Sequence, residues 1–396
     1  MKARFETLDC LPTPLPLSQC VVYKDEILIC GGFHETACYS YHTKKKQYKQ
    51  ICSYPKDVKL FGHCVVKRVN QDNPNAITLL SFGGKYKHTL VMNYVSVWTN
   101  VDSDDGDEDD NKEDQKKEIR PSARGKNTWL PFTDKQNRVI QIGRPEDYYD
   151  GARAVIGGSL QHLLFITYAP KHIDVFNLDT YTYVLRSTLP LGDDNTDILY
   201  HCFVCKTMPA MDKSNITEMV LFYKKLGFAI TYDETKHAFE FQKLTVSDAI
   251  APFVDYAYVY INGDILFFGG DSSDVGGVSK AVHKYSTKEK KWTKFDHTLP
   301  VALSDCIGIV SEDHSCVHIL GGFDHNYNGV STHLKTDARQ WLGGVRDEDT
   351  YTKVKPKVQA PKPSLMKMDP EEILKHPEAV EKQSFFFFKK KKRTNI

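Results

Sequence analysis

The sequence predicts an all-β fold, a six-bladed β-propeller in which each blade is a four-stranded antiparallel sheet. Two observations lead to this prediction. Pairs of glycines recur at the ends of short apolar runs, and pairs of aromatic residues seven positions apart recur along the chain. Repeated units of about 50 residues that hold several short strands are typical of propeller blades. The predicted propeller spans residues 1–342.

Glycine pairs end four apolar runs, ILICGG, LLSFGG, ILFFGG and VHILGG. The gap between the first two pairs equals the gap between the last two, 52 residues in each case. Glycine allows a positive φ and a close approach of two backbones, which a chain needs where it leaves a strand near the crowded centre of a propeller. The pairs are Gly31 and Gly32, Gly83 and Gly84, Gly269 and Gly270, and Gly321 and Gly322.

Aromatic pairs supply a second marker of the repeat, and they add bulk where neighbouring blades pack together. Tyr94 of the second unit has no aromatic partner seven positions later, and Trp129 is expected to be its displaced partner. The other pairs with this spacing are Tyr41 and Tyr48, Phe176 and Tyr183, Tyr232 and Phe239, Tyr285 and Trp292, and, with a leucine substituted, Leu334 and Trp341.

A displaced Trp129 implies an insertion of 28 residues in the second unit. Gly84 and Gly270 are 186 residues apart, and removing 28 leaves 158, which is three periods of about 53. Two units without glycine pairs must therefore lie between these glycines. They are expected to include residues 162–184 and 218–241, and they bring the number of blades to six.

The repeat resembles the kelch motif, in which a glycine pair ends the second strand, a tyrosine lies in the third, and a tryptophan opens the fourth. The resemblance covers residues 1 to about 342. It implies a non-catalytic protein–protein interaction module, an adaptor or scaffold, that binds its partner through the loops after the glycine pairs. Candidate partner-binding residues in these loops are His34, Tyr86, His88, Asp271, Asp324, His325 and Tyr327.

Closure of the ring is expected from an N-terminal strand. The opening residues FETLDCLP are similar to TKFDHTLP of the fifth unit, and pairing them with the last blade would protect both edges. Trp341 competes with Phe5 for the same position. We favour the N-terminal strand.

Four of the ten cysteines are expected at one equivalent place, at the start of the innermost strand of four blades: Cys20, Cys64, Cys202 and Cys306. A residue that recurs by register is most simply a small packing element. Cys202 and Cys205 have the spacing of a redox or zinc motif, but residues three apart in a strand point to opposite faces. We therefore predict no metal site and no cofactor.

An enzyme is the alternative hypothesis. His63 and His201 precede two of these cysteines, and Gln19 and Asp305 are expected to fill the same slot in other blades, at the channel mouth. Histidine and aspartate can pair for acid–base chemistry, so this slot could serve a hydrolase or an oxidase-like enzyme. No copper site like that of galactose oxidase, whose repeats are kelch-like, can be assembled from the spacing. A diverged repeat protein without function is a third interpretation.

Charge and composition narrow the classes of partner. The formal net charge of +1 argues against broad binding to nucleic acid, and no apolar run approaches the roughly 18 residues of a spanning helix. Ten cysteines without an apolar secretory segment indicate an intracellular, cytoplasmic protein with free thiols. We expect a monomeric propeller.

Two segments fall outside the repeat. The acidic insertion, about residues 102–126, contains the tract DSDDGDEDDNKEDQKKE and is predicted to be a disordered, solvated loop. The Lys- and Pro-rich tail, 343–396, ends in a basic run from Lys389 to Arg393, which could act in nuclear import or in binding an anionic membrane. A low-complexity extension without a specific role is the alternative for this tail.

Overall fold

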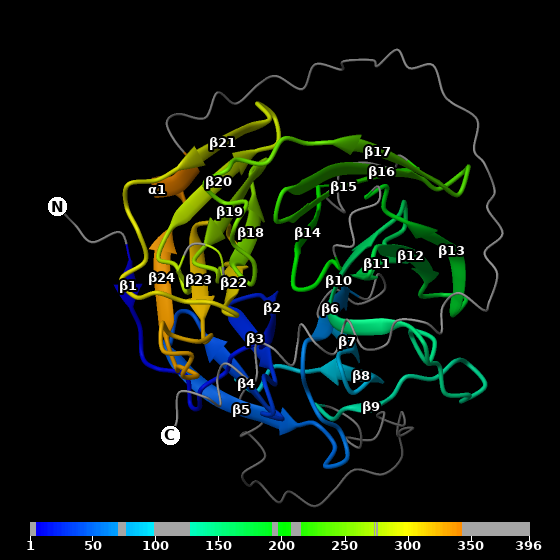
Figure 1. Ribbon diagram of the computed structural model, residues 1–396. Helices are drawn as coiled ribbons and strands as arrows, with labels where there is room; N and C mark the ends of the chain where they lie inside the picture. The colour runs from blue at the N-terminus through cyan, green and yellow to red at the C-terminus, as the bar shows by residue number, and fades with distance from the viewer. Residues whose placement is uncertain are drawn as a thin grey trace, which may run out of the picture. The chain divides into compact units, whose positions relative to one another are not determined.

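A computed structural model describes residues 5–69, 77–98, 127–191, 197–206, 215–272, 274 and 276–342. Its strands form six four-stranded antiparallel sheets, arranged as blades around a common centre (Figure 1). The predicted all-β, six-bladed propeller is therefore confirmed. No helix among the described residues is long and apolar enough to cross a membrane. The acidic insertion and the tail predicted from the sequence lie outside the described residues.

In five blades the strands follow chain order from the centre outward. The innermost strands are β2 (Gln19–Tyr23), β6 (His63–Val69), β10 (Tyr148–Gly157), β14 (Cys202–Cys205), β18 (Ala257–Ile261) and β22 (Ile307–Val310). The second strands are β3 (Glu26–Cys30), β7 (Ile77–Gly83), β11 (Leu163–Ala169), β15 (Ile216–Tyr223), β19 (Asp264–Phe268) and β23 (Cys316–Leu320).

Two further strands complete each blade. The third strands are β4 (Ala37–His42), β8 (His88–Tyr94), β12 (His172–Asn177), β16 (Leu226–Asp233), β20 (Val282–Ser286) and β24 (His333–Asp337). The outer strands are β5 (Gln47–Ser53), β9 (Leu130–Pro131), β13 (Thr182–Thr188), β17 (Ala238–Lys243), β21 (Lys291–Lys294) and, in the sixth blade, β1 (Glu6–Thr7).

The N-terminal strand closes the ring, as favoured from the sequence. In β1, Glu6 pairs with Lys335 and Thr7 with Leu334 of β24. Trp341 does not compete for this place, because it lies in the short helix α1 (Arg339–Leu342). Its ring packs against Phe5, with the centroids 5.4 Å apart. The two aromatic residues therefore support the same closure instead of excluding each other.

The seven-residue aromatic spacing arises from cross-strand pairing between the third and fourth strands. Tyr285 lies directly opposite Trp292, and their ring centroids are 5.0 Å apart. The same register joins three other pairs with this spacing: Tyr41 with Tyr48, Phe176 with Tyr183, and Tyr232 with Phe239. Leu334 and Trp341 are not joined in this way, because Trp341 lies in a short helix and Leu334 pairs with Thr7 and Ile319. Directly opposed aromatic side chains stabilise a sheet, and here they add bulk to the third and fourth strands of these blades.

The expected pairing of Tyr94 with Trp129 is not observed. Strand β9 pairs Leu130 with Val91, so one further step along this register brings Trp129 opposite Met92 instead of Tyr94. The indole of Trp129 stacks on Tyr54 at 4.6 Å between centroids. Counted from the residue opposite the first glycine of each pair, Met92 and not Tyr94 is the equivalent of Tyr41, so the sequence alignment assigned Trp129 to the wrong residue of β8.

The cysteine register was also wrong in part. Cys64 pairs with Phe82, the residue before the glycine pair, and the equivalent positions in the first and sixth blades are Gln19 and Ile307. Cys20 therefore comes one residue later than the common position, and Cys306 one residue earlier. Successive strand residues point to opposite faces, so these two cysteines do not share the environment of Cys64.

Candidate functional site

The channel mouth is built from six equivalent residues, which precede the innermost strand in five blades and lie within β10 in the third. All six have a positive φ, between 52° and 66°. Backbone N–H groups of four of them donate to the carbonyl of the equivalent residue in the preceding blade, at 2.7–3.0 Å. These bonds join neighbouring blades around the axis and explain why non-glycine residues tolerate this backbone conformation. The six residues are Leu17, Gly62, Gly151, Tyr200, Asp255 and Asp305.

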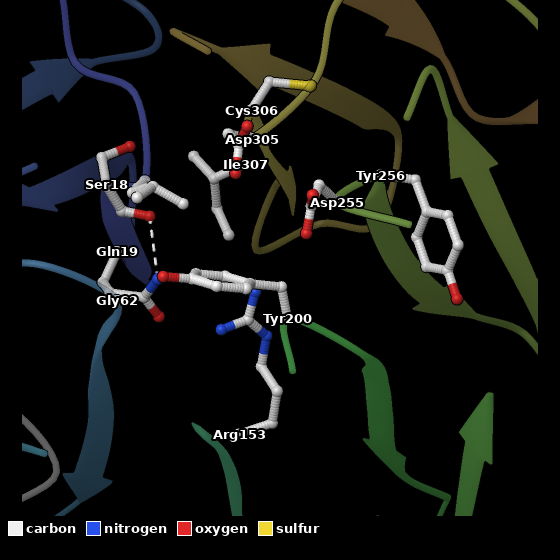
Figure 2. A pocket seen from close by; sticks show the side chains of 11 residues that line it. Ser18, Gln19, Gly62, Arg153, Tyr200, Asp255, Tyr256, Asp305, Cys306 and Ile307 are labelled. Atoms are coloured by element: carbon white, nitrogen blue, oxygen red, sulfur yellow. Dashed lines mark hydrogen bonds between the residues drawn. The ribbon is translucent and has the colours of Figure 1, made fainter. Parts of the chain in front are cut away.

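A small polar pocket lies inside this ring (Figure 2). Arg153 of β10 reaches into it, with its guanidinium 5.6 Å from the ring centroid of Tyr200. The hydroxyl of Tyr200 donates to the carboxylate of Asp150 at 2.5 Å, and burial raises the pKa of Asp150 to about 6. Asp255 and Asp305 also line the pocket. At the mouth, the guanidinium of Arg153 thus lies near the carboxyl groups of Asp150, Asp255 and Asp305.

The two histidines expected at the mouth lie in the interior instead. His63 and His201 are each 0% exposed, and their ring nitrogens bond the carbonyl of Cys30 and the hydroxyl of Thr167. The expected shared slot was wrong, because the residues equivalent to His63 are Ser18 and Cys306. Gln19 comes one residue after this position and Asp305 one residue before it, and both line the mouth. A histidine–aspartate dyad at the mouth is therefore not formed.

No three His, Cys, Asp or Glu side chains gather closely enough to hold an ion within the described part of the chain. Cys202 and Cys205, the pair with metal-like spacing, pack in different core clusters on the two faces of β14. Their predicted divergence is confirmed.

Buried histidines make the propeller sensitive to acid. Burial lowers the pKa of His63 to about 4, whereas an unfolded histidine titrates near 6.5. Between these values the unfolded chain binds a proton that the folded chain does not, so stability falls as the pH falls. Asp150 and Asp174 act in the opposite direction, because burial raises the pKa of each to about 6. Burial also lowers the pKa of His88, His201, His283, His318 and His333.

We expect the His63→Gln variant to lose less stability than the wild type between about pH 7 and about pH 5, by roughly 2 kcal/mol. Glutamine places a side-chain N–H near the position of Nε2, which bonds the carbonyl of Cys30, but it does not titrate. Urea unfolding of both proteins at the two pH values measures the difference. Equal losses in the two proteins would show that His63 is not the proton-binding group described above.

The loops that follow the glycine pairs lie on the same face as the mouth, because each second strand ends beside the start of an innermost strand. His34, Tyr86 and His325 are exposed there, and Tyr327 is half-buried. The hydroxyl of Tyr327 donates to the carboxylate of Asp271 at 3.1 Å, which ties the loops of the fifth and sixth blades together.

Besides Tyr327, three other candidate partner-binding residues have structural roles in this face. His88 is 8% exposed and bonds Ser81 at 2.7 Å, and Asp271 is 3% exposed. The carboxylate of Asp324 accepts the backbone N–H groups of Asn326 and Asn328 and so shapes its own turn. These side chains hold the loops in place, whereas His34, Tyr86 and His325 are free to meet a partner.

An aromatic cluster on this face was missed in the sequence. Phe33 packs against Phe61 at 5.1 Å and Phe323 at 6.1 Å between centroids, and Lys85 lies over Phe61. Phe33, Lys85 and Phe323 each follow a glycine pair directly, so the repeat register could have identified them. Phe61 and Arg153 carry no such signal, because they lie in a connection and in a degenerate blade.

Comparisons with known proteins show the fold only. No family model matches the chain, and no curated protein matches it. Among solved structures, that of YjhT is similar, with a TM-score of 0.53 and 13% sequence identity over 82% of this chain and 95% of YjhT. At that identity the likeness indicates a shared propeller architecture and nothing about activity. The resemblance to kelch repeats stays a prediction.

Proposed function

We propose that the protein is a non-catalytic interaction module that binds a protein partner through the face formed by the loops after the glycine pairs. The observation that carries this proposal is the aromatic surface on that face. Phe33, His34 and Phe61 contact one another at its centre, and Tyr86 is 42% exposed nearby. Aromatic side chains held by a rigid frame are frequent anchors of protein interfaces.

The loops are fixed by contacts that span neighbouring blades, which favours a preorganised surface. The backbone N–H of His34 donates to the carbonyl of Leu60 at 3.1 Å, and the N–H of Phe33 donates to that of Pro16 at 2.7 Å. A surface that is already ordered loses little conformational entropy when a partner binds. An adaptor or scaffold in the cytoplasm fits this arrangement.

An enzyme with its site at the mouth is the competing proposal. The environment of the carboxyl groups at the mouth favours the interaction module instead. Asp150 is 1% exposed and accepts hydrogen bonds from Tyr200 and Tyr148, so it serves the internal frame. His63 and His201 are as deeply buried, and their lowered pKa values keep them neutral. The side chains suited to acid–base work are thus engaged in packing.

The triple variant His34→Ala, Tyr86→Ala, Tyr327→Ala should release a partner that co-purifies with the full-length protein, with an affinity loss of at least about tenfold. A matched control removes Val69 and Leu160, which are 48% and 62% exposed at the hairpins on the opposite face. Quantitative affinity purification of the three proteins measures the difference. Full retention of the partner by the folded triple variant would refute the proposed face.

A further inference from the structure

A groove of about 600 Å³ opens on the binding face between the first and second blades. One wall is the connection to β6, with Val58 and Lys59, and the other is the β7–β8 loop, with Tyr86 and Lys87. The segment after β9 adds Val139, which is 57% exposed. Apolar side chains thus lie within a groove whose edges carry lysines.

Among the described residues, no carboxylate lies within 4 Å of the ammonium groups of the lysines at this groove. Asp147 and Glu146 attract Lys87 from farther away, and both form ion pairs with Arg144. Lys59 lies over the ring of Tyr86, with the ammonium 5.7 Å from the centroid. Lys87 donates to the backbone carbonyls of Arg144 and Pro145, and Lys85 lies over Phe61 just outside the groove. Asp57 is the one acidic residue in the lining. Local charge is therefore positive, although the net charge of the whole chain is only +1.

We propose that this groove binds an acidic peptide segment that carries a bulky apolar residue. The apolar residue would lie between Val58 and Val139, where it buries exposed hydrocarbon, and the flanking carboxylates would pair with Lys59 and Lys87. This inference rests on the proposed function and names the chemical class of partner for that face.

A single-stranded nucleic acid would also meet cations and aromatic rings here, but the geometry favours a peptide. Bases stack on aromatic faces that are open. One face of Tyr86 and one face of Phe61 already have a lysine ammonium group over them, and Val58, Leu90 and Val139 add aliphatic side chains to the groove. Aliphatic side chains accept an apolar residue better than a base.

Selection from a phage-displayed library of random peptides of about 12 residues tests the inference, since that length accommodates one apolar residue with acidic residues on both sides. Wild-type full-length protein should enrich peptides rich in Asp and Glu around one Phe, Trp, Leu or Ile. The affinity of an enriched synthetic peptide should then fall at least about tenfold in the double variant Lys59→Glu, Lys87→Glu, and similarly in Val139→Asp.

The matched control reverses two exposed lysines of the fifth blade, Lys288→Glu and Lys291→Glu, and should leave the affinity unchanged. Thermal unfolding confirms that each variant is folded. The inference is overturned by an enriched pool without acidic bias, by equal losses in groove and control variants, or by tighter groove-dependent binding of a fluorescent single-stranded oligonucleotide. If the groove variants keep the co-purifying partner but the triple loop variant loses it, the groove is wrong and the interaction module stands.

Discussion

Replacing Gly321 with alanine should destabilise the propeller by about 3–5 kcal/mol, whereas the same change at Gly276 should cost about 1 kcal/mol. Both glycines have a positive φ, +62° and +105°, so both variants bear backbone strain. Only at Gly321 would the added Cβ meet backbone, 2.3 Å from the carbonyl oxygen of Leu15. At Gly276 no atom of the described residues lies within 4 Å.

The difference has a specific origin in the junction between the sixth and first blades. Leu15 is fully buried, and two residues later the N–H of Leu17 donates to the carbonyl of Asp305 at 2.9 Å. Moving this connection to relieve the clash would disturb both the core and the ring of bonds at the mouth. Urea unfolding of the two variants measures the two losses. Equal losses would contradict the close-approach role of the glycine pairs.

The architecture was predictable because its signals are backbone requirements. A glycine pair is needed where a second strand approaches the neighbouring connection, and opposed aromatic residues recur because the third hairpin has a fixed length. The exact alignment of the innermost strands from blade to blade was less predictable. Ser18 and Cys306 fill the position of His63, and small or polar residues of this kind have no common hydrophobicity that sequence periodicity could detect.

The loops that form the candidate site could be predicted from the sequence, but which of their side chains are exposed could not. His34 and Tyr86 are exposed as expected, yet His88 begins β8 and turns inward to Ser81. A residue at a loop–strand boundary can point either way, and the sequence does not settle which. Arg153 was missed because the third blade has lost its glycine pair, which removes the marker that aligns β10 with the other innermost strands.

Replacing Trp341 with alanine should cost about 3–5 kcal/mol, as expected for a fully buried tryptophan. Trp341 is 1% exposed, and its ring contacts Phe5, Phe268 and Phe295 at 5.4, 6.0 and 5.0 Å between centroids. Its indole N–H donates to the hydroxyl of Thr336 at 2.9 Å. The residue thus joins the N-terminal strand, the fifth blade and β24.

A double-mutant cycle that combines Trp341→Ala with Phe5→Ala shows whether the two aromatic rings pack together or compete for one position. If the two rings pack together, each single variant already loses their contact. The double variant then costs less than the sum of the singles, by about 1 kcal/mol. If the rings competed for one position, each could replace the other, so the singles would be mild and the double variant would cost more than their sum. Urea unfolding of the wild type, the two single variants and the double variant gives the sign of the coupling energy. A double variant that loses more stability than the sum of the single variants would refute the joint closure of the ring by β1 and α1.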